Sequence, residues 1–575
     1  MPDNIQYESV SDSYLESRQL KRGAAGWVLL AGLGVSYVIS GDFAGWNFGL
    51  AEGGFGGLLI ATLIVGAMYT CMVLSLAELS ACLPTAGGGY SYARRAMGPT
   101  FGFLTGTAIL LEYMFAPAAI AVFIGAYCNE LLGLDGPLVY GAFYIVFVGI
   151  HLWGVGEALR VMLSITGIAV LALLVFFVGM IPAVDLANLT DIPVNGAALG
   201  ASAFLPEGYI GIWAALPFAM WLFLAVEGVP LAAEECRDPG TDMPRGIIVA
   251  MLILLAFGGL VLFLAPAAAG ANYMKDHGAP LVGALQIVYG EDSMAVVFVN
   301  AVGLAGLIAS FFSIIYAYSR QVFALSRAGY LPRFLSVTGK RRTPALALMI
   351  PGAIGFVFSL TGEGDLMIAM AVFGATISYA LMTLSHIILR RTEPRLERPY
   401  RTPGGTLTSG VAFGLSVLAF ASTFLVNLEA AAWGSVFYLI LIGYFFFYSR
   451  HHLVAQAPEE EFAAISAAEK EINLVLAVEK EQLLEVARVL IEQQLLHSSW
   501  LHYRIQHYLE YWLHSEDRFH RRFHRHPTTG HHHRHHQHCH QCHQYQNQRF
   551  HWRLYRKHPY HLILRRCRYH HRTYH

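Results

Sequence analysis

Long apolar runs, each about the length of a membrane-spanning helix, recur along most of the 575-residue chain. A helix that crosses a bilayer needs about 20 mostly apolar residues. Twelve runs approach or exceed this length, and they lie at 23–50, 57–83, 100–131, 137–153, 158–182, 211–233, 245–269, 294–322, 343–361, 365–390, 408–428 and 432–449. In lipid, a helix satisfies its own backbone hydrogen bonds. The pattern therefore predicts an all-α polytopic membrane protein with twelve transmembrane helices.

Polar residues interrupt the first of these runs near its centre. Ser40 and Gly41 precede an acid, Asp42, within the segment 34–46. A charge at the bilayer centre costs about 2.5–3.5 kcal/mol on insertion scales, and a broken helix frees backbone groups that need partners in protein or in a water-filled cavity. Broken spans of this kind form the substrate sites of secondary transporters. The alternative is a kinked helix in which Asp42 only pairs with a neighbouring helix.

The sixth run carries a similar interruption, because Glu227 stands beside Gly228 within an apolar stretch. The first and sixth runs each open a group of five spans, about 23–182 and 211–390. Matching interruptions at equivalent places are typical of an inverted repeat. The sequence thus predicts a five-plus-five repeat whose broken helices 1 and 6 face each other, with two further spans outside it.

Other polar residues in the spans are weaker candidates for a role in transport. Glu112 and Tyr113 in the third run are candidates for the transport pathway, with a structural hydrogen-bonding role as the alternative. Glu78 lies at the end of the second run, where we expect it to hold a loop in place. His386, near the end of the tenth run, is expected at the membrane interface. The glycine-rich run 53–57 predicts a turn with a close-packing surface.

Basic residues gather in alternate loops, and this sets the expected orientation. The residues on one side are Arg18, Lys21, Arg22, Arg94, Arg95, Arg160, Arg237, Arg245, Arg320, Arg327, Arg333, Lys340, Arg341, Arg342, Arg390, Arg391, Arg395, Arg398, Arg401 and Arg450. The opposite loops carry Lys275 and mostly acids. By the positive-inside rule, both ends of the membrane part are expected in the cytoplasm. The expected location is the cytoplasmic (inner) membrane.

Composition excludes an ordinary soluble protein, since 55% of the residues are hydrophobic, 13% are charged and the mean hydropathy is +0.48. The segment 1–22 is polar and mixed in charge and shows no cleavable signal peptide, so we expect a cytoplasmic N-terminal segment followed by the transporter domain 23–450. No nucleophile, metal or cofactor constellation is visible in the membrane part. We therefore expect no enzyme activity, no cofactor and no metal there.

Beyond the last span the chain changes character. Residues 451–496 have helical spacing and predict a cytoplasmic helical tail. Residues 497–575 are rich in histidine and arginine, and after Arg518 they contain no Asp, Glu, Ala, Val, Met or Ser. Metal binding is one interpretation, but the ligand pairs and apolar core of a structural zinc site are missing. We favour a disordered or non-native segment, of the kind that a shifted reading frame produces.

The end of the second run reads Ala-Glu-Leu-Ser-Ala-Cys-Leu-Pro-Thr-Ala-Gly-Gly-Gly-Tyr-Ser-Tyr over 77–92 and continues through 93–106. Further motifs follow in order at 214–218, 234–239 and 243–245. These motifs resemble those of the amino acid–polyamine–organocation permeases. The resemblance covers about residues 20–450. Within the family, residues 41–47 and the region 53–113 look most like ethanolamine permeases.

The chain departs from the family pattern in two informative places. The family's first-helix break usually reads Ile-Gly-Ser/Ala-Gly-Val/Ile-Phe, so Asp42 replaces an apolar residue. In relatives that carry amino acids, backbone N–H groups at this break hold the substrate carboxylate; an acid there would repel it and would suit an ammonium group instead. Some proton-driven relatives have a lysine where this chain has Gly167, so a lysine-based coupling mechanism is not expected. Trp221 matches an aromatic gate of the family, and an aromatic face attracts ammonium groups.

The resemblance and the residues together predict a secondary active transporter that takes up a small organic amine, ethanolamine first, by alternating access. The expected substrate-binding residues are Val38, Ser40, Gly41, Asp42, Phe43, Trp221, Phe223, Ala225 and Glu227. The alternatives are a permease for a neutral or cationic amino acid and, from another class, a membrane-embedded ligand sensor. The expected partners are the small-molecule substrate and the lipid bilayer, with a homodimer as an option and no nucleic acid.

Overall fold

The computed structural model describes residues 25–454 with gaps at 154, 292 and 340–342, together with residues 5, 7, 8, 10, 14 and 23. Nearly all of the predicted helical tail 451–496 and all of the histidine-rich segment 497–575 lie outside the described residues. The predictions made for those two segments therefore remain predictions.

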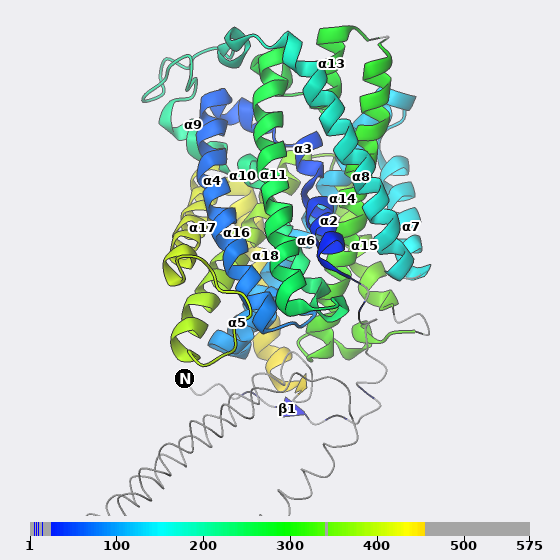
Figure 1. The fold of residues 1–575 in the computed structure, drawn as a ribbon, viewed down its shortest axis with the longest axis vertical. Coiled ribbons are helices and arrows are strands. Elements are labelled where there is room, and N and C mark those ends of the chain that lie inside the picture. Colours follow the sequence, from blue (N-terminus) through cyan, green and yellow to red (C-terminus); the bar gives the residue numbers. More distant parts are fainter. Residues whose placement is uncertain are drawn as a thin grey trace, which may run out of the picture. The chain divides into compact units, whose positions relative to one another are not determined.

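Helices coincide with all twelve predicted spans (Figure 1). They are α2 (Trp27–Val38) with α3 (Ser40–Phe43), α4 (Phe48–Cys82), α6 (Pro99–Leu132), α7 (Pro137–Trp153), α8 (Val155–Met180), α9 (Gly208–Ala214) with α10 (Leu216–Trp221) and η3 (Val226–Glu235), α11 (Pro239–Ala269), α14 (Met294–Arg327), α15 (Ala345–Ser359), α16 (Gly364–Thr392), α17 (Thr406–Val426) and α18 (Leu428–Phe447). In the described part of the chain, nine helical segments are long and apolar enough to cross a membrane, and shorter apolar helices accompany them. The all-α polytopic fold is confirmed.

Short elements join these spans at the two ends of the bundle. They are α5 (Gly89–Met97), η1 (Ile181–Ala183), η2 (Leu186–Thr190), α12 (Ala271–Met274), α13 (Pro280–Tyr289), η4 (Arg333–Ser336) and η5 (Ser449–His451). Two strands also occur among the described residues, β1 (Tyr7–Glu8) and β2 (Leu453–Val454), and they pair in parallel. The segment after the last span therefore begins as a 3₁₀ turn and a strand.

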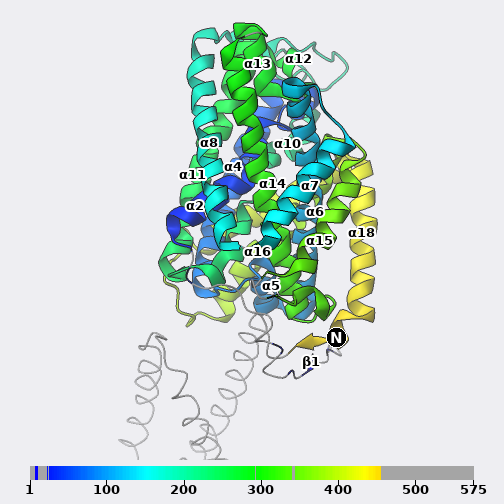
Figure 2. The ribbon, with the colours of Figure 1, turned by 90° about the vertical axis from the view of Figure 1, so that its right-hand side faces the viewer.

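Figure 2 shows α12 and α13 at one end of the bundle and α5 and β1 at the other. We call the latter the basic end, because the basic loops of the sequence lie there. Several residues counted among those loops lie within helices instead. Arg320 lies inside α14 and is 1% exposed, since α14 continues to Arg327 and does not end near residue 322.

The first two spans also divide differently from the prediction. The first ends at Phe43, and Phe48 already belongs to α4. The glycine-rich run 53–57 lies inside α4 and forms a kink at Gly54, where φ is +65°, instead of a turn. Its close-packing character is confirmed, because a Cβ at Gly53 would lie 2.4 Å from the carbonyl oxygen of Gly211.

Candidate functional site

The first span breaks where the sequence predicted. Helix α2 ends at Val38, and α3 is a single turn that carries Asp42. The chain then becomes extended at Ala44 and passes through Gly45 at φ +93°, a left-handed conformation that favours glycine. The break thus places Asp42 in a short helical turn between α2 and α4, where its side chain is buried and 0% exposed.

The sixth span breaks between Trp221, where α10 ends, and Val226, where the 3₁₀ helix η3 begins. Ala225 has φ +76°, and it is the single non-glycine residue with positive φ in the part of the chain that the structure describes. A left-handed conformation costs an alanine about 1–2 kcal/mol. Such strained residues concentrate at functional sites, where the surrounding structure holds them in place.

The two breaks lie directly against each other. The indole N–H of Trp221 donates to the carbonyl oxygen of Ala44 over 2.9 Å. A Cβ at Gly41 would lie 2.5 Å from the carbonyl oxygen of Trp221, and one at Gly45 would lie 2.7 Å from the indole nitrogen. Glycine at both positions therefore permits the contact, and the predicted facing of helices 1 and 6 is found.

The carboxylate of Asp42 has no partner at this site. Neither of its oxygens has a hydrogen-bond partner among the described residues. Its side chain points to α11, where a Cβ on Gly258 would lie 3.7 Å from Oδ1 and 3.5 Å from the ring of Phe223. The kinked-helix alternative required Asp42 to pair with a neighbouring helix, and the described residues supply no such pair.

Glu227 lies in a separate polar cluster, which we call the carboxyl pair cluster: Glu112, Glu227, Tyr69, Tyr113 and Tyr379. Tyr113 donates to Oε1 of Glu227 over 2.8 Å, and Tyr379 donates to Oε2 over 2.8 Å. The hydroxyl of Tyr379 also lies 3.2 Å from Oε1 of Glu112. All five side chains are buried. The structure therefore brings together three predicted residues, Glu112, Tyr113 and Glu227.

Sequence reasoning missed the two other members of this cluster. Tyr69 of α4 donates to the hydroxyl of Tyr379 over 3.2 Å, and Tyr379 comes from α16. Both tyrosines stand in apolar runs, where an aromatic residue at helical spacing is indistinguishable from core packing. No local signal in the sequence marks them.

The remaining predicted site residues make hydrogen bonds and packing contacts around the two breaks. Ser40 donates to the hydroxyl of Ser310 over 2.9 Å. The carbonyl oxygen of Phe43 accepts a hydrogen bond from Tyr127 over 2.8 Å. The ring of Phe43 lies against two glycines of α14, Gly303 and Gly306. Val38 is buried, and the ring of Phe223 packs on Tyr69 with centroids 5.6 Å apart.

Toward the basic end, the same two spans are tied together again. The backbone N–H of Ala25, before α2, donates to the carbonyl oxygen of Glu235 over 3.0 Å. The side chain of Glu235 forms a buried ion pair with Arg320, and Glu234 pairs with Arg327 of α14. These contacts close the basic end of the bundle beneath the two breaks.

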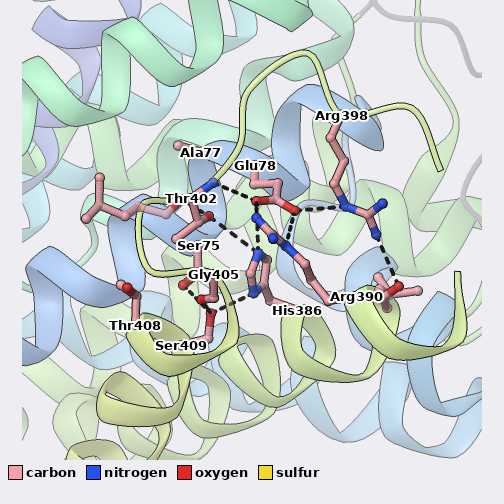
Figure 3. A network of polar contacts seen from close by, with 12 residues as sticks. Ser75, Ala77, Glu78, His386, Arg390, Arg398, Thr402, Gly405, Thr408 and Ser409 are labelled. Carbon is pink, nitrogen blue, oxygen red and sulfur yellow. Dashed lines mark hydrogen bonds and ion pairs between the residues drawn. The ribbon is translucent and has the colours of Figure 1, made fainter. Parts of the chain in front are cut away.

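A second network fixes the loop between α16 and α17 (Figure 3). Glu78 accepts from Nε of Arg390 over 2.8 Å and from the backbone N–H of Thr402 over 2.7 Å, and it pairs with Arg398. The predicted loop-holding role of Glu78 is confirmed. His386, expected at the membrane interface, has its ring buried between Glu78 and Ser409, to which it lies at 3.2 and 2.6 Å.

The described residues contain no group of three or more His, Cys, Asp or Glu side chains placed to hold a metal ion. The histidine and cysteine runs of the last segment are not among those residues. Asp42 faces apolar groups, and Glu227 faces tyrosine hydroxyls. Such acids can attract a cation or bind a proton.

Broken helices that face each other at buried acids, within a bundle of apolar spans, define a polytopic membrane transporter. The sequence profile of the amino acid permease family matches residues 26–447. The chain belongs to this family, and thus to the amino acid–polyamine–organocation superfamily. It is a secondary transporter of a small molecule and not an enzyme.

The curated relatives are permeases and transporters. A transporter of Rhizobium meliloti (strain 1021), named as uncharacterized, is 29% identical over 402 residues, which cover 68% of this chain and 85% of that protein. The branched-chain amino acid permease BcaP of Bacillus subtilis (strain 168) is 26% identical over 424 residues, 69% of this chain and 86% of its own. The methylthioribose transporter of the same organism is 25% identical over 447 residues, 72% and 89% respectively.

Proposed function

We propose that this permease takes up a small organic amine without a carboxylate, with ethanolamine as the favoured substrate. The observation that carries the proposal is the unpaired, fully buried carboxylate of Asp42 at the first break. A buried charge is stable when it is paired, and no basic residue among the described ones pairs with it. The ammonium group of the substrate supplies both the opposite charge and the hydrogen-bond donors that the carboxylate of Asp42 needs.

The other residues of the site fit the same substrate class. Trp221 covers the break from the α10 side, where its aromatic face attracts a cation. The backbone around Ser40 and Gly41 offers polar groups for the hydroxyl of ethanolamine. Both carboxylate oxygens of Glu227 already accept hydrogen bonds, so we assign the ammonium contact to Asp42.

An amino acid is the second candidate, and the relative named branched-chain amino acid permease supports it. Against it, Asp42 would repel the substrate carboxylate at the place where the resemblance implies its binding. The relative named methylthioribose transporter supports a substrate range wider than amino acids.

The charge distribution supports a location in the cytoplasmic membrane with the basic end in the cytoplasm. By the positive-inside rule, loops rich in arginine remain on that side. Both the N-terminal segment and the segment after α18 then lie in the cytoplasm.

Uptake into proteoliposomes tests the proposal. Purified protein is reconstituted, and accumulation of labelled ethanolamine is compared with that of branched-chain, other neutral and cationic amino acids. We expect ethanolamine to be accumulated and unlabelled ethanolamine to compete better than any amino acid. Accumulation of an amino acid with no effect of ethanolamine would replace the proposal with the second candidate.

A further inference from the structure

The contacts among the members of the carboxyl pair cluster require one hydrogen more than its three tyrosines supply. Tyr113 uses its hydrogen on Glu227. Tyr379 has one hydrogen but lies within hydrogen-bond distance of both carboxyl groups, 2.8 Å from Glu227 and 3.2 Å from Glu112. The shorter contact takes that hydrogen. The contact with Glu112 then joins two oxygens with no hydrogen between them, and this is unfavourable unless Glu112 carries a proton.

Charge points to the same conclusion. The ionisable groups that face the pair are tyrosines from three helices, Tyr69 of α4, Tyr113 of α6 and Tyr379 of α16. A fourth, Tyr37 of α2, lies with Tyr113 around Gly228. Among the described residues, no Lys, Arg or His pairs with either glutamate. The nearby Arg320 is already paired with Glu235.

Two ionised carboxylates in such a site would repel each other strongly, because the effective dielectric of a protein interior is low. Carboxyl groups that share a site in this way hold one proton between them. With the proton on Glu112, its O–H donates to the oxygen of Tyr379, and Tyr379 donates to Glu227. Every contact among the five members then has one hydrogen. Tyr69 directs its own hydrogen to the second lone pair of the Tyr379 oxygen, at 3.2 Å, in preference to the carbonyl oxygen of Met220, at 3.4 Å.

We propose that Glu112 and Glu227 form the proton-binding site of this transporter and that binding of one proton to the pair is coupled to transport. This inference rests on the proposed uptake function and adds the coupling ion.

The position of the pair explains how its charge can affect the site. Glu227 lies two residues after Ala225, at the start of η3, so its bonds to Tyr113 and Tyr379 hold this half-helix against α6 and α16. Loss of the shared proton adds a negative charge between η3 and α6. The two carboxylates then repel, and the half-helix next to the substrate break separates more readily from α6.

The experiment measures accumulation of ethanolamine in proteoliposomes with and without an inward proton gradient. We define the gradient ratio as accumulation with the proton gradient divided by accumulation without it. For the unmodified protein, we expect this ratio to be well above one. Glu112→Gln fixes the charge of the pair at that of its protonated form, so its ratio should fall to one, and Glu227→Gln should do the same. The control is Glu429→Gln, which neutralises an exposed acid in α18 and should keep the full ratio.

Unchanged ratios in both variants would overturn the proton site. A ratio of one in the unmodified protein would overturn it as well, while leaving the amine substrate intact. If ethanolamine does not bind, the proposed function fails. The same ratios, measured with the best compound of the substrate panel, then test the proton site.

If a variant does not fold, the test is made on the unmodified protein in weakly buffered detergent. We expect this protein to take up protons when substrate binds, and the absence of proton uptake would contradict the proposal.

Discussion

The indole N–H of Trp221 donates to the carbonyl oxygen of Ala44 over 2.9 Å, so one broken helix bonds directly to the backbone of the other. This bond joins the two places where the spans lose their regular hydrogen bonding. The ring of Phe123 packs edge-on against Trp221, with centroids 6.1 Å apart, and holds the indole in position. We therefore expect Trp221 to close the proposed substrate site.

Replacing Trp221 with phenylalanine tests this closure. Trp221→Phe keeps an aromatic ring but removes the donor, and loss of one hydrogen bond costs about 0.5–1.5 kcal/mol. We expect the affinity for substrate to fall by about twofold to tenfold, with faster release, as measured by binding to the purified protein. The matched control is Trp433→Phe, because Trp433 is 61% exposed on α18. Equal effects of both changes would contradict a closing role for Trp221.

Gly41 should not tolerate even a methyl group. In Gly41→Ala, the Cβ would lie 2.5 Å from the carbonyl oxygen of Trp221, a backbone atom that cannot rotate away. The two breaks must then move apart, and we expect transport to be lost and the melting temperature in detergent to fall. The control is Gly259→Ala in α11, where no atom lies within 4 Å of the added Cβ. Normal transport by Gly41→Ala would show that the breaks need not touch.

Strain at Ala225 predicts a substitution that stabilises the protein. Ala225→Gly removes the steric cost of the left-handed conformation, about 1–2 kcal/mol, and adds back about 0.4–1 kcal/mol through the greater freedom of the unfolded chain. We expect a small rise in melting temperature. Ala219→Gly in the helix α10 should lower the melting temperature, because glycine in a helix interior destabilises the fold by about 0.5–1 kcal/mol. A lower melting temperature for both variants would exclude strain at Ala225.

The sequence predicted the spans and both breaks, because apolar runs and the polar residues that interrupt them are local features. It placed Glu112, Tyr113 and Glu227 in or near the pathway for the same reason. It could not place Tyr69 and Tyr379, whose hydroxyls matter only through partners on other helices. It also counted Arg320 as a loop charge, because the buried partner that keeps Arg320 inside the fold, Glu235, is 85 residues away in the chain.

The two ends of α16 offer a direct test of orientation. Glu363 and Arg391 are exposed at opposite ends of this single helix. With one cysteine at either position in an otherwise cysteine-free protein, a membrane-impermeant reagent should label position 363 from outside intact cells. Position 391 should be labelled only after the cells are opened. The reverse pattern would invert the proposed orientation, and labelling of both positions from one side would contradict the assignment of α16 as a span.

Neutralising Asp42 is the sharpest test of the amine substrate. Asp42→Asn keeps nearly the same volume but removes the charge, and loss of a hydrogen bond to a charged group costs about 1.5–3 kcal/mol. We expect the affinity for ethanolamine to fall by about tenfold to more than a hundredfold. Binding of ethanolamine to the purified, folded variant is the measurement. Asp276→Asn, which changes an exposed acid in the loop after α12, is the control and should bind as the unmodified protein does.

The same variant should respond differently to amino acids. Without the charge of Asp42, a substrate carboxylate is no longer repelled from the first break, so competition by neutral amino acids should stay level or strengthen. A purely structural Asp42 predicts another result, in which Asp42→Asn changes stability or membrane insertion while the preference among substrates is kept. Unchanged affinity for ethanolamine would remove Asp42 from the binding site. An amino acid would then be the better substrate candidate, because the buried carboxylate is the observation that favours an amine.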